Sequence, residues 1–148
     1  MRRLFIYYSY TGNCEKVKEA FEEKGFEIRK VIAKKHLPKS FFWGMMTGGF
    51  LASINYKDKL VNFDNVTDGY DDIVIASPIW NGRFCPVLNG VLNQMDLTGK
   101  KVTFVFTAGS GAGPKALKRV NKEYPEAKVV FLKEPKKYPE ELKKLAAL

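Results

Sequence analysis

The sequence contains few of the residues that most often carry enzymatic chemistry or bind metal ions. Its 148 residues include one histidine, His36, and two cysteines, Cys14 and Cys85. A single histidine beside Lys35 is most simply a surface residue and supports no Ser-His-Asp or Cys-His catalytic set. The cysteines lack the spacing of a metal site and cannot form a disulfide framework. We therefore expect no catalytic residue set, no metal site and a reducing, cytoplasmic setting.

Long apolar runs are also missing. The longest uncharged stretch, residues 40–56, is shorter than the ~20 apolar residues of a membrane span and contains three glycines. Met1-Arg2-Arg3 leads directly into a strand pattern, which argues against a signal peptide. Because 45% of the residues are hydrophobic, the chain can form a core, and its length suits one domain over residues 1–148.

Several nucleotide and phosphate motifs are incomplete or absent. The pattern G-x-G-x-x-G starts at Gly109 and Gly111 but has Pro114 in its last position, and no Gly-Lys-Ser/Thr of a P-loop occurs. A Cys-x5-Arg phosphatase would have arginine where the chain has Ala20 or Val91. A phospho-accepting receiver needs acidic residues where two strands end, at Tyr8-Ser9 and Ala76-Ser77. The sequence therefore excludes four classes of protein, namely dinucleotide-binding domains, P-loop proteins, Cys-x5-Arg phosphatases and phospho-accepting receivers.

Negative charge is scarce in the last third of the chain. The formal net charge is +9, of which residues 1–99 contribute +2 and residues 100–148 contribute +7. Such a surface could attract an acidic partner, although a solvated lysine-rich exterior is the simpler interpretation. Nucleic acid is not an expected partner, because there are 20 lysines against 5 arginines and no aromatic-basic interleaving.

The chain does contain a well-marked strand-turn-helix unit at its start. Leu4 to Tyr8 is an unbroken apolar run typical of a buried strand, and residues 13–24 predict a helix that ends at Gly25. Between them lies a loop of small residues with the hydroxyls of Ser9 and Thr11. A helix N-terminus leaves backbone N–H groups unpaired, so this loop could cradle a phosphate. An ordinary turn with Thr11 as helix cap fits the pattern equally well.

Further strands alternate with helices along the rest of the chain. Strands are predicted over 26–33, 73–76, 102–106 and 129–132, and the first of these is half-exposed, as at a sheet edge. Helices are predicted from Pro86 to Gly99, from Pro114 with Ala116, Leu117 and Val120 inward, and from Pro139 to the end. The apolar segment 41–52 predicts a buried helix or, alternatively, a dimer surface. Five strands alternating with helices predict an α/β fold, a doubly wound parallel sheet covered on both faces.

Three loops rich in Gly, Ser and Thr follow the first, third and fourth predicted strands. In a doubly wound sheet, ligands bind beyond the carboxyl ends of the strands, where the strand order reverses. Trp80 in the second loop could offer its face to a planar ring, or it could pack on Phe84. Gly109 and Gly111 in the third loop allow close backbone approach. The sequence therefore predicts a site for a phosphate and a flat aromatic group.

These loops resemble those of the flavodoxin family. Ser9-Tyr10-Thr11-Gly12-Asn13-Cys14 is similar to the phosphate loop S/T-x-T-G-x-T, and Ser77-Pro78-Ile79-Trp80-Asn81-Gly82 is similar to S-P-[IV]-[WY]-x-G. Thr107 to Gly111 is similar to the third flavodoxin loop. The match spans nearly the whole chain, in the family's order and spacing. It implies a three-layer flavodoxin-like fold with five parallel strands in the order 2-1-3-4-5, a short-chain form, and non-covalent binding of FMN.

The resemblance also implies which residues would contact FMN. The first loop would hold the phosphate, Trp80 would stack on the isoalloxazine, Asn81 and Gly82 would approach its N5 edge, and the third loop would contact its pyrimidine side. The complete set of expected cofactor-binding residues is Ser9, Tyr10, Thr11, Gly12, Asn13, Cys14, Pro78, Ile79, Trp80, Asn81, Gly82, Thr107, Ala108, Gly109, Ser110 and Gly111.

Three features depart from the family pattern. Cys14 replaces a hydroxyl, and its position at a helix N-terminus predicts a lowered thiol pKa in the protein without FMN. The chain is basic, whereas flavodoxins are typically acidic, so docking to a basic partner is not expected. Arg83 takes a place where acidic residues often flank the flavin, and a cation there would make the hydroquinone potential less negative.

Three functions remain open at this point. The first is an FMN electron carrier that serves redox partner proteins, which need only a held flavin with an exposed edge. The second is a flavodoxin-like NAD(P)H-dependent reductase of quinone, FMN or nitro compounds, acting as a homodimer through residues 41–56. The third is an interaction module without flavin that uses the basic last third.

Overall fold

The fold is taken from a computed structural model that describes residues 2–34, 50 and 56–148. The apolar segment expected to form a helix or a dimer surface, and the lone histidine, lie outside the described residues apart from Phe50. The described elements are β1 Arg2–Tyr7, α1 Asn13–Glu23, β2 Glu27–Lys30, β3 Tyr70–Trp80, β4 Arg83–Phe84, α3 Pro86–Gln94, β5 Lys101–Ala108, α4 Pro114–Glu123, β6 Lys128–Lys133 and the 3-10 helix η1 Pro139–Leu145.

Five of these strands form one parallel sheet in the order β2-β1-β3-β5-β6. Counted without β4, this is the predicted order 2-1-3-4-5, so the flavodoxin-like α/β fold is confirmed. The short strand β4 is an addition that pairs antiparallel with the end of β3. Asn81 and Gly82 join the two strands with φ values of 53° and 71°, as a two-residue hairpin turn requires. The stretch expected to be a loop after residue 76 is therefore largely strand.

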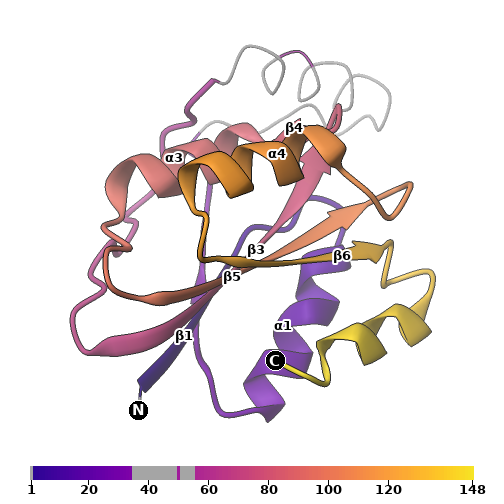
Figure 1. Ribbon diagram of the computed structural model, residues 1–148, viewed down its shortest axis with the longest axis horizontal. Coiled ribbons are helices and arrows are strands. Elements are labelled where there is room, and N and C mark those ends of the chain that lie inside the picture. The colour runs from indigo at the N-terminus through magenta and orange to yellow at the C-terminus, as the bar shows by residue number, and fades with distance from the viewer. Residues whose placement is uncertain (1, 35–49, 51–55) are drawn as a thin grey trace.

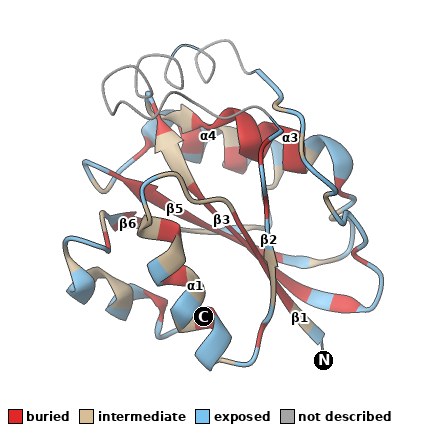
Figure 2. Ribbon diagram, turned by 180° about the vertical axis from the view of Figure 1, so that it is seen from behind, coloured by how far each residue is buried: buried red, intermediate tan, exposed pale blue. Residues whose placement is uncertain are grey.

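The sheet is covered by helices on both faces. Figure 1 shows α3 and α4 on one face and α1 and η1 on the other. Two apolar clusters correspond to these layers: Val87, Leu88 and Val120 belong to the first, and Val17 and Phe21 belong to the second. Figure 2 shows buried residues concentrated along the central strands and on the inner sides of the helices. The hydrophobic effect thus holds three layers together.

Several element boundaries differ from the sequence prediction. The edge strand β2 covers four residues rather than 26–33. Beyond it, the Val31 N–H still donates to the Tyr7 carbonyl at 2.8 Å, and Ala33 forms a bridge with Leu60. The helix α3 ends at Gln94 rather than at Gly99, since Met95 has extended backbone angles. Leu117 in α4 is 38% exposed and does not point inward.

The last helix has 3-10 rather than α geometry. Leu145 is buried in the core under α1, and Leu142 and Leu148 pack against the same cluster. A spacing of three residues suits a 3-10 helix, whose side chains repeat every third position. The predicted apolar face is therefore present on a helix of a different type.

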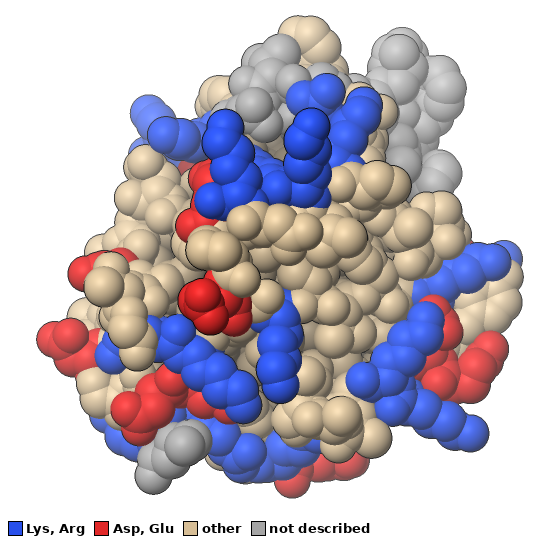
Figure 3. Space-filling view, viewed as in Figure 1, with Lys and Arg blue, Asp and Glu red and all other residues tan. Residues whose placement is uncertain are grey.

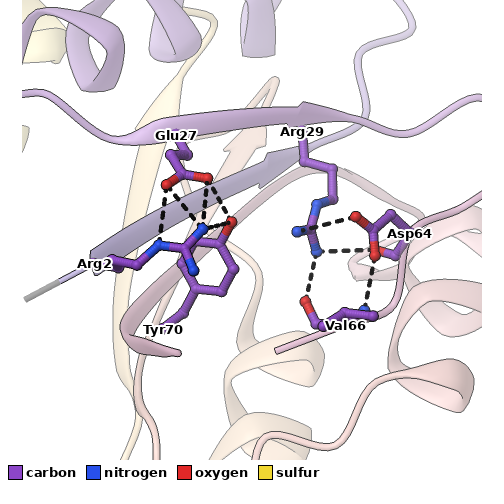
Figure 4. A network of polar contacts seen from close by, with 6 residues as sticks. All are labelled: Arg2, Glu27, Arg29, Asp64, Val66 and Tyr70. Carbon is purple, nitrogen blue, oxygen red and sulfur yellow. Dashed lines mark hydrogen bonds and ion pairs between the residues drawn. The ribbon is translucent and has the colours of Figure 1, made fainter. Parts of the chain in front are cut away.

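Two polar networks fasten the edge strand β2 to its neighbours (Figure 4). The Arg2 guanidinium donates to Glu27 at 3.1 Å and to the Tyr70 hydroxyl at 2.9 Å, while that hydroxyl donates to Glu27. The Arg29 guanidinium donates to the carbonyls of Asp64 and Val66, both at 2.9 Å. The four-residue strand is thereby tied to β1, to β3 and to the connecting chain.

Candidate functional site

The three predicted loops lie around one cavity at the carboxyl ends of β1, β3 and β5. The cavity has a volume of about 200 Å³ and is placed where the strand order reverses between β1 and β3. Each loop contributes three lining residues, and one further residue follows the end of β6. These residues are Tyr10, Thr11, Asn13, Pro78, Ile79, Trp80, Thr107, Ala108, Gly109 and Glu134. The topology thus brings together segments that are about 100 residues apart in the chain.

The first loop is shaped by its own hydrogen bonds. The Gly12 N–H donates to Ser9 Oγ at 3.1 Å, and Asn13 Nδ2 donates to Thr11 Oγ1 at 3.0 Å. Gly12 precedes α1 with φ 94°, a conformation that favours glycine. No side chain caps this helix, so Thr11 is not its cap. The N–H groups of the first helical turn therefore face the loop without a capping side chain, which suits an anionic ligand.

Cys14 points away from the first loop and into the core. Its exposed fraction is 1%, and its Sγ lies 3.6 Å from Thr107 Oγ1. Burial raises the pKa of the Cys14 thiol to about 12, although the hydrogen bond with Thr107 acts in the opposite direction. The prediction of a lowered pKa was wrong, because removal from water outweighs the helix terminus. Only the backbone of Cys14 remains available to a ligand at the loop.

Trp80 lies at the end of β3 and is 6% exposed. Its ring meets the ring of Tyr8 edge-on at 6.2 Å and that of Tyr10 at 5.6 Å. Phe84, the partner considered from sequence, packs instead against Phe104 and Phe106. Trp80 lines the cavity with a small part of its surface. Stacking on its full face therefore requires neighbouring side chains to move.

The third loop begins inside β5. Thr107 and Ala108 are buried strand residues, and Gly109 is exposed, with no atom within 4 Å of the position that a Cβ would occupy. Gly111 closes a turn on the Ala108 carbonyl at 3.2 Å. The exposed hydroxyl of Ser110 donates to the Ala112 carbonyl at 3.1 Å. The open side at Gly109 leaves room for a ligand to approach the backbone.

The remaining expected residues lie in the same three loops but outside the cavity lining. They are Ser9, Gly12, Cys14, Asn81, Gly82, Ser110 and Gly111. The Gly82 carbonyl accepts a hydrogen bond from the Ala116 N–H at 3.1 Å, which ties the hairpin turn to the start of α4. The Asn81-Gly82 turn, which the family resemblance would bring close to the N5 edge of the isoalloxazine, is thus held by α4.

A fourth segment, between β6 and η1, was missed by the sequence analysis. Glu134 lines the cavity with φ 34°, and the Lys136 N–H donates to Asn13 Oδ1 at 3.0 Å. The signal was available, since the last strand of a parallel sheet ends at the same edge as the others. We call residues 134–138 the β6–η1 turn below.

The described residues give no sign of a metal centre or a membrane segment. Within residues 2–34, 50 and 56–148, no group of three or more His, Cys, Asp or Glu could hold a metal ion. In the same part of the chain, none of the helices combines the length and the apolar character of a transmembrane segment.

Comparison with known proteins gives structural matches without sequence matches. No protein-family model and no curated protein matches the chain. A candidate flavoprotein from Bacteroides uniformis aligns with TM-score 0.75 and 19% identity over 99% of this chain and 98% of that chain. A candidate flavoprotein from Bacteroides eggerthii aligns with TM-score 0.74 and 17% identity over 98% of both chains. A flavoprotein from Lactobacillus acidophilus in complex with FMN aligns with TM-score 0.67 and 22% identity, over 86% of this chain and 89% of that chain. These similarities establish a shared fold.

Proposed function

We propose that this protein binds FMN without a covalent bond in the cavity at the carboxyl edge of the sheet and acts as an electron carrier. The main support is the meeting of the three loops around one cavity at the point where the strand order reverses. The FMN complex of the similarly folded Lactobacillus acidophilus protein supports the choice of ligand.

The residues present suit the two chemical halves of FMN. The uncapped first turn of α1 and the hydroxyls of Ser9 and Thr11 offer hydrogen-bond donors to a phosphate. Ile79 and Trp80 give an apolar wall, and the open backbone at Gly109 lies across the cavity. When bound, FMN supplies one- and two-electron redox chemistry. The protein's part is to hold and orient the ring and to limit its contact with water.

The side chains that line the cavity suit a protein that carries electrons. Among the described lining residues, the one carboxyl group is that of Glu134, and none is a histidine, lysine or arginine. Transfer of single electrons needs no acid or base, whereas reductases that act on organic substrates commonly use one. The free, buried thiols of Cys14 and Cys85 suit a reducing compartment, so we propose a cytoplasmic carrier.

We also propose that the carrier's partner proteins are acidic. Lys115, Lys118 and Lys122 are exposed at a spacing of three and four residues, and so they share one face of α4. Figure 3 shows basic side chains gathered over this helix. Because α4 begins beside the Gly82 turn, a partner held by these lysines would dock close to the cavity.

The first test of the function is a visible spectrum of the purified protein, followed by titration of the apoprotein with FMN and anaerobic reduction with dithionite. We expect flavin absorbance or tight uptake of added FMN, and about tenfold weaker binding in Thr11→Val if that hydroxyl holds the phosphate. Thr98→Val, at the opposite edge of the sheet, is the matched control. A colourless protein that ignores FMN would refute the proposal. Rapid flavin bleaching by NAD(P)H alone would instead indicate a reductase.

The partner proposal can be tested with small electron acceptors of opposite charge. We expect the reduced protein to react faster with ferricyanide than with hexaamminecobalt(III) after correction for driving force, and added salt to reduce the ferricyanide rate. Lys118→Glu should lower that rate, whereas Lys143→Glu in η1 should change it little. Equal effects of the two substitutions would count against docking at α4.

A further inference from the structure

The β6–η1 turn is folded back onto the first loop. The Glu134 carbonyl accepts hydrogen bonds from the N–H groups of Lys137 at 2.8 Å and Tyr138 at 2.9 Å, which makes the turn tight. The Lys136 N–H donates to Asn13 Oδ1 at 3.0 Å, and the same Asn13 amide donates to Thr11. One side chain therefore couples the two segments, and it places Lys136 beside the start of α1.

The Lys136 side chain then crosses the first loop. Its Nζ lies 3.4 Å from the Thr11 carbonyl oxygen. A Cβ added at Gly12 would lie 3.4 Å from Nζ and 3.5 Å from Cδ, so the lysine stem passes within contact distance of the glycine. The ammonium group thus lies over the residues that precede the first turn of α1.

The charges around this ammonium group favour an anion as its partner. A helix N-terminus carries a partial positive charge, so a cation placed there is repelled unless an anion lies between them. Glu15, in the first turn of α1, is occupied by Lys30 at 2.8 Å and by the Tyr7 hydroxyl at 3.0 Å. Within the described part of the chain, the polar contact made by the Lys136 ammonium is the neutral Thr11 carbonyl. Glu134 belongs to the same turn but lines the cavity.

From these contacts we infer that Lys136 is a phosphate-binding residue, whose ammonium group neutralises the phosphate of FMN together with the N–H groups at the start of α1. The inference rests on the proposed function. It adds a binding residue from a fourth segment, outside the three loops that suggested the ligand. It also gives a reason for the hydrogen bond between the β6–η1 turn and Asn13, which holds the cation in place.

The test compares Lys136→Met with Lys137→Met and uses FMN and riboflavin, which lacks the phosphate. Lys136→Met leaves the turn attached, because the bond to Asn13 comes from the backbone. Lys137 is the matched control, since it is exposed and its Nζ lies 5.4 Å from the centre of the Tyr138 ring. Dissociation constants of the apoproteins are measured by quenching of flavin fluorescence over a series of salt concentrations.

We expect Lys136→Met to weaken FMN binding about tenfold and riboflavin binding less than about twofold. Its FMN affinity should also depend less on salt than that of the wild type. Lys136→Arg should restore most of the affinity, and Lys137→Met should stay within about twofold for both ligands. An unchanged ratio of FMN to riboflavin affinity in Lys136→Met would overturn the role of Lys136 while leaving FMN binding intact.

A wild-type protein that binds neither flavin would refute the proposed function, and a second measurement then decides the role of Lys136. Inorganic phosphate is added to the labelled protein, and the amide NMR signals of Gly12, Asn13 and Cys14 are followed. Shifts that are present in the wild type and lost in Lys136→Met would uphold an anion-binding role. The absence of shifts in the wild type would overturn it.

Discussion

The Cys14 thiol lies 3.6 Å from the Thr107 hydroxyl, so a residue of the first loop and a residue of the third loop meet beneath the candidate site. This contact joins α1 to β5 inside the core, where both residues are buried. The thiol therefore serves packing between two of the segments that surround the cavity, and its chemistry is suppressed by burial.

Neither thiol should react in the native protein. Burial raises the pKa of both Cys14 and Cys85 to about 12, so at pH 8 on the order of one thiol in 10,000 is ionised. We expect a disulfide reagent at pH 8 to modify no cysteine until denaturant is added, and two cysteines thereafter. The absorbance of the released thiol measures this. Rapid native labelling at Cys14 would contradict its burial.

Gly12→Ala should destabilise the protein more than Gly109→Ala does. Gly12 has φ 94°, a backbone conformation that residues with a side chain rarely adopt, whereas the space around its added Cβ is ordinary. A non-glycine residue in this conformation costs about 1 kcal/mol. Gly109 has no atom within 4 Å of its added Cβ, so its substitution should cost less than about 0.5 kcal/mol. Urea unfolding of the two variants gives the comparison, and equal losses would argue against the left-handed conformation at Gly12.

Gly90→Ala should cost about 1–3 kcal/mol of the free energy of unfolding. An added Cβ would lie 2.3 Å from the Asp58 backbone oxygen, and backbone cannot turn aside as a flexible side chain can. The connecting chain is held at that point, since the Asp58 N–H donates to the Pro86 carbonyl at 2.9 Å. Gln94→Ala, exposed on the same helix, is the control and should be nearly neutral. A fully stable Gly90→Ala would mean that residues 56–60 do not pack on α3 in solution.

The network at Glu27 should make stability depend on pH in a defined direction. The Tyr70 hydroxyl and then the Arg2 guanidinium lower the pKa of the Glu27 carboxyl. A lowered pKa means that the stabilisation is complete above about pH 4.3, the ordinary value, and is lost as the pH falls through the lower folded-state value. The difference in stability between the wild type and Tyr70→Phe should therefore be constant from pH 5 to 7 and shrink below about pH 4.

Denaturant unfolding over this pH range checks the prediction at Glu27. The control is Glu27→Gln, which removes the titrating group itself. In the Glu27→Gln background, Tyr70→Phe should have the same effect at every acidic pH. If the difference in stability between the wild type and Tyr70→Phe grew toward low pH, this would contradict a lowered pKa of the Glu27 carboxyl.

Much of the fold could be predicted because it follows from local patterns. Unbroken apolar runs mark the central strands, and the alternation of strands with helices then leaves few possible orders. The β3–β4 hairpin is not evident from the sequence, where Ser77 to Phe84, with its proline and its Asn-Gly pair, predicts a loop. In the structure Pro78 lies beside Thr107 in the ladder, and the strand continues to Trp80.

The residues of the site were less predictable than their loops. Cys14, Val17 and Phe21 share a helical face at spacings of three and four, so the burial of Cys14 could have been inferred from the core stripe of α1. Family resemblance favoured the loop instead. The approach of Lys136 could not be read from local sequence, because it depends on a turn 123 residues after Asn13.

The two outer strands carry charge where another sheet could join them. On one side β2 consists of Glu27, Ile28, Arg29 and Lys30, and on the other β6 begins with Lys128 and ends with Lys133. A free strand edge is a template for aggregation, and charged side chains at the edge oppose it. Concentrated solutions of this protein should therefore resist fibril formation, and neutralising the lysines of β6 is the change most suited to reveal that protection.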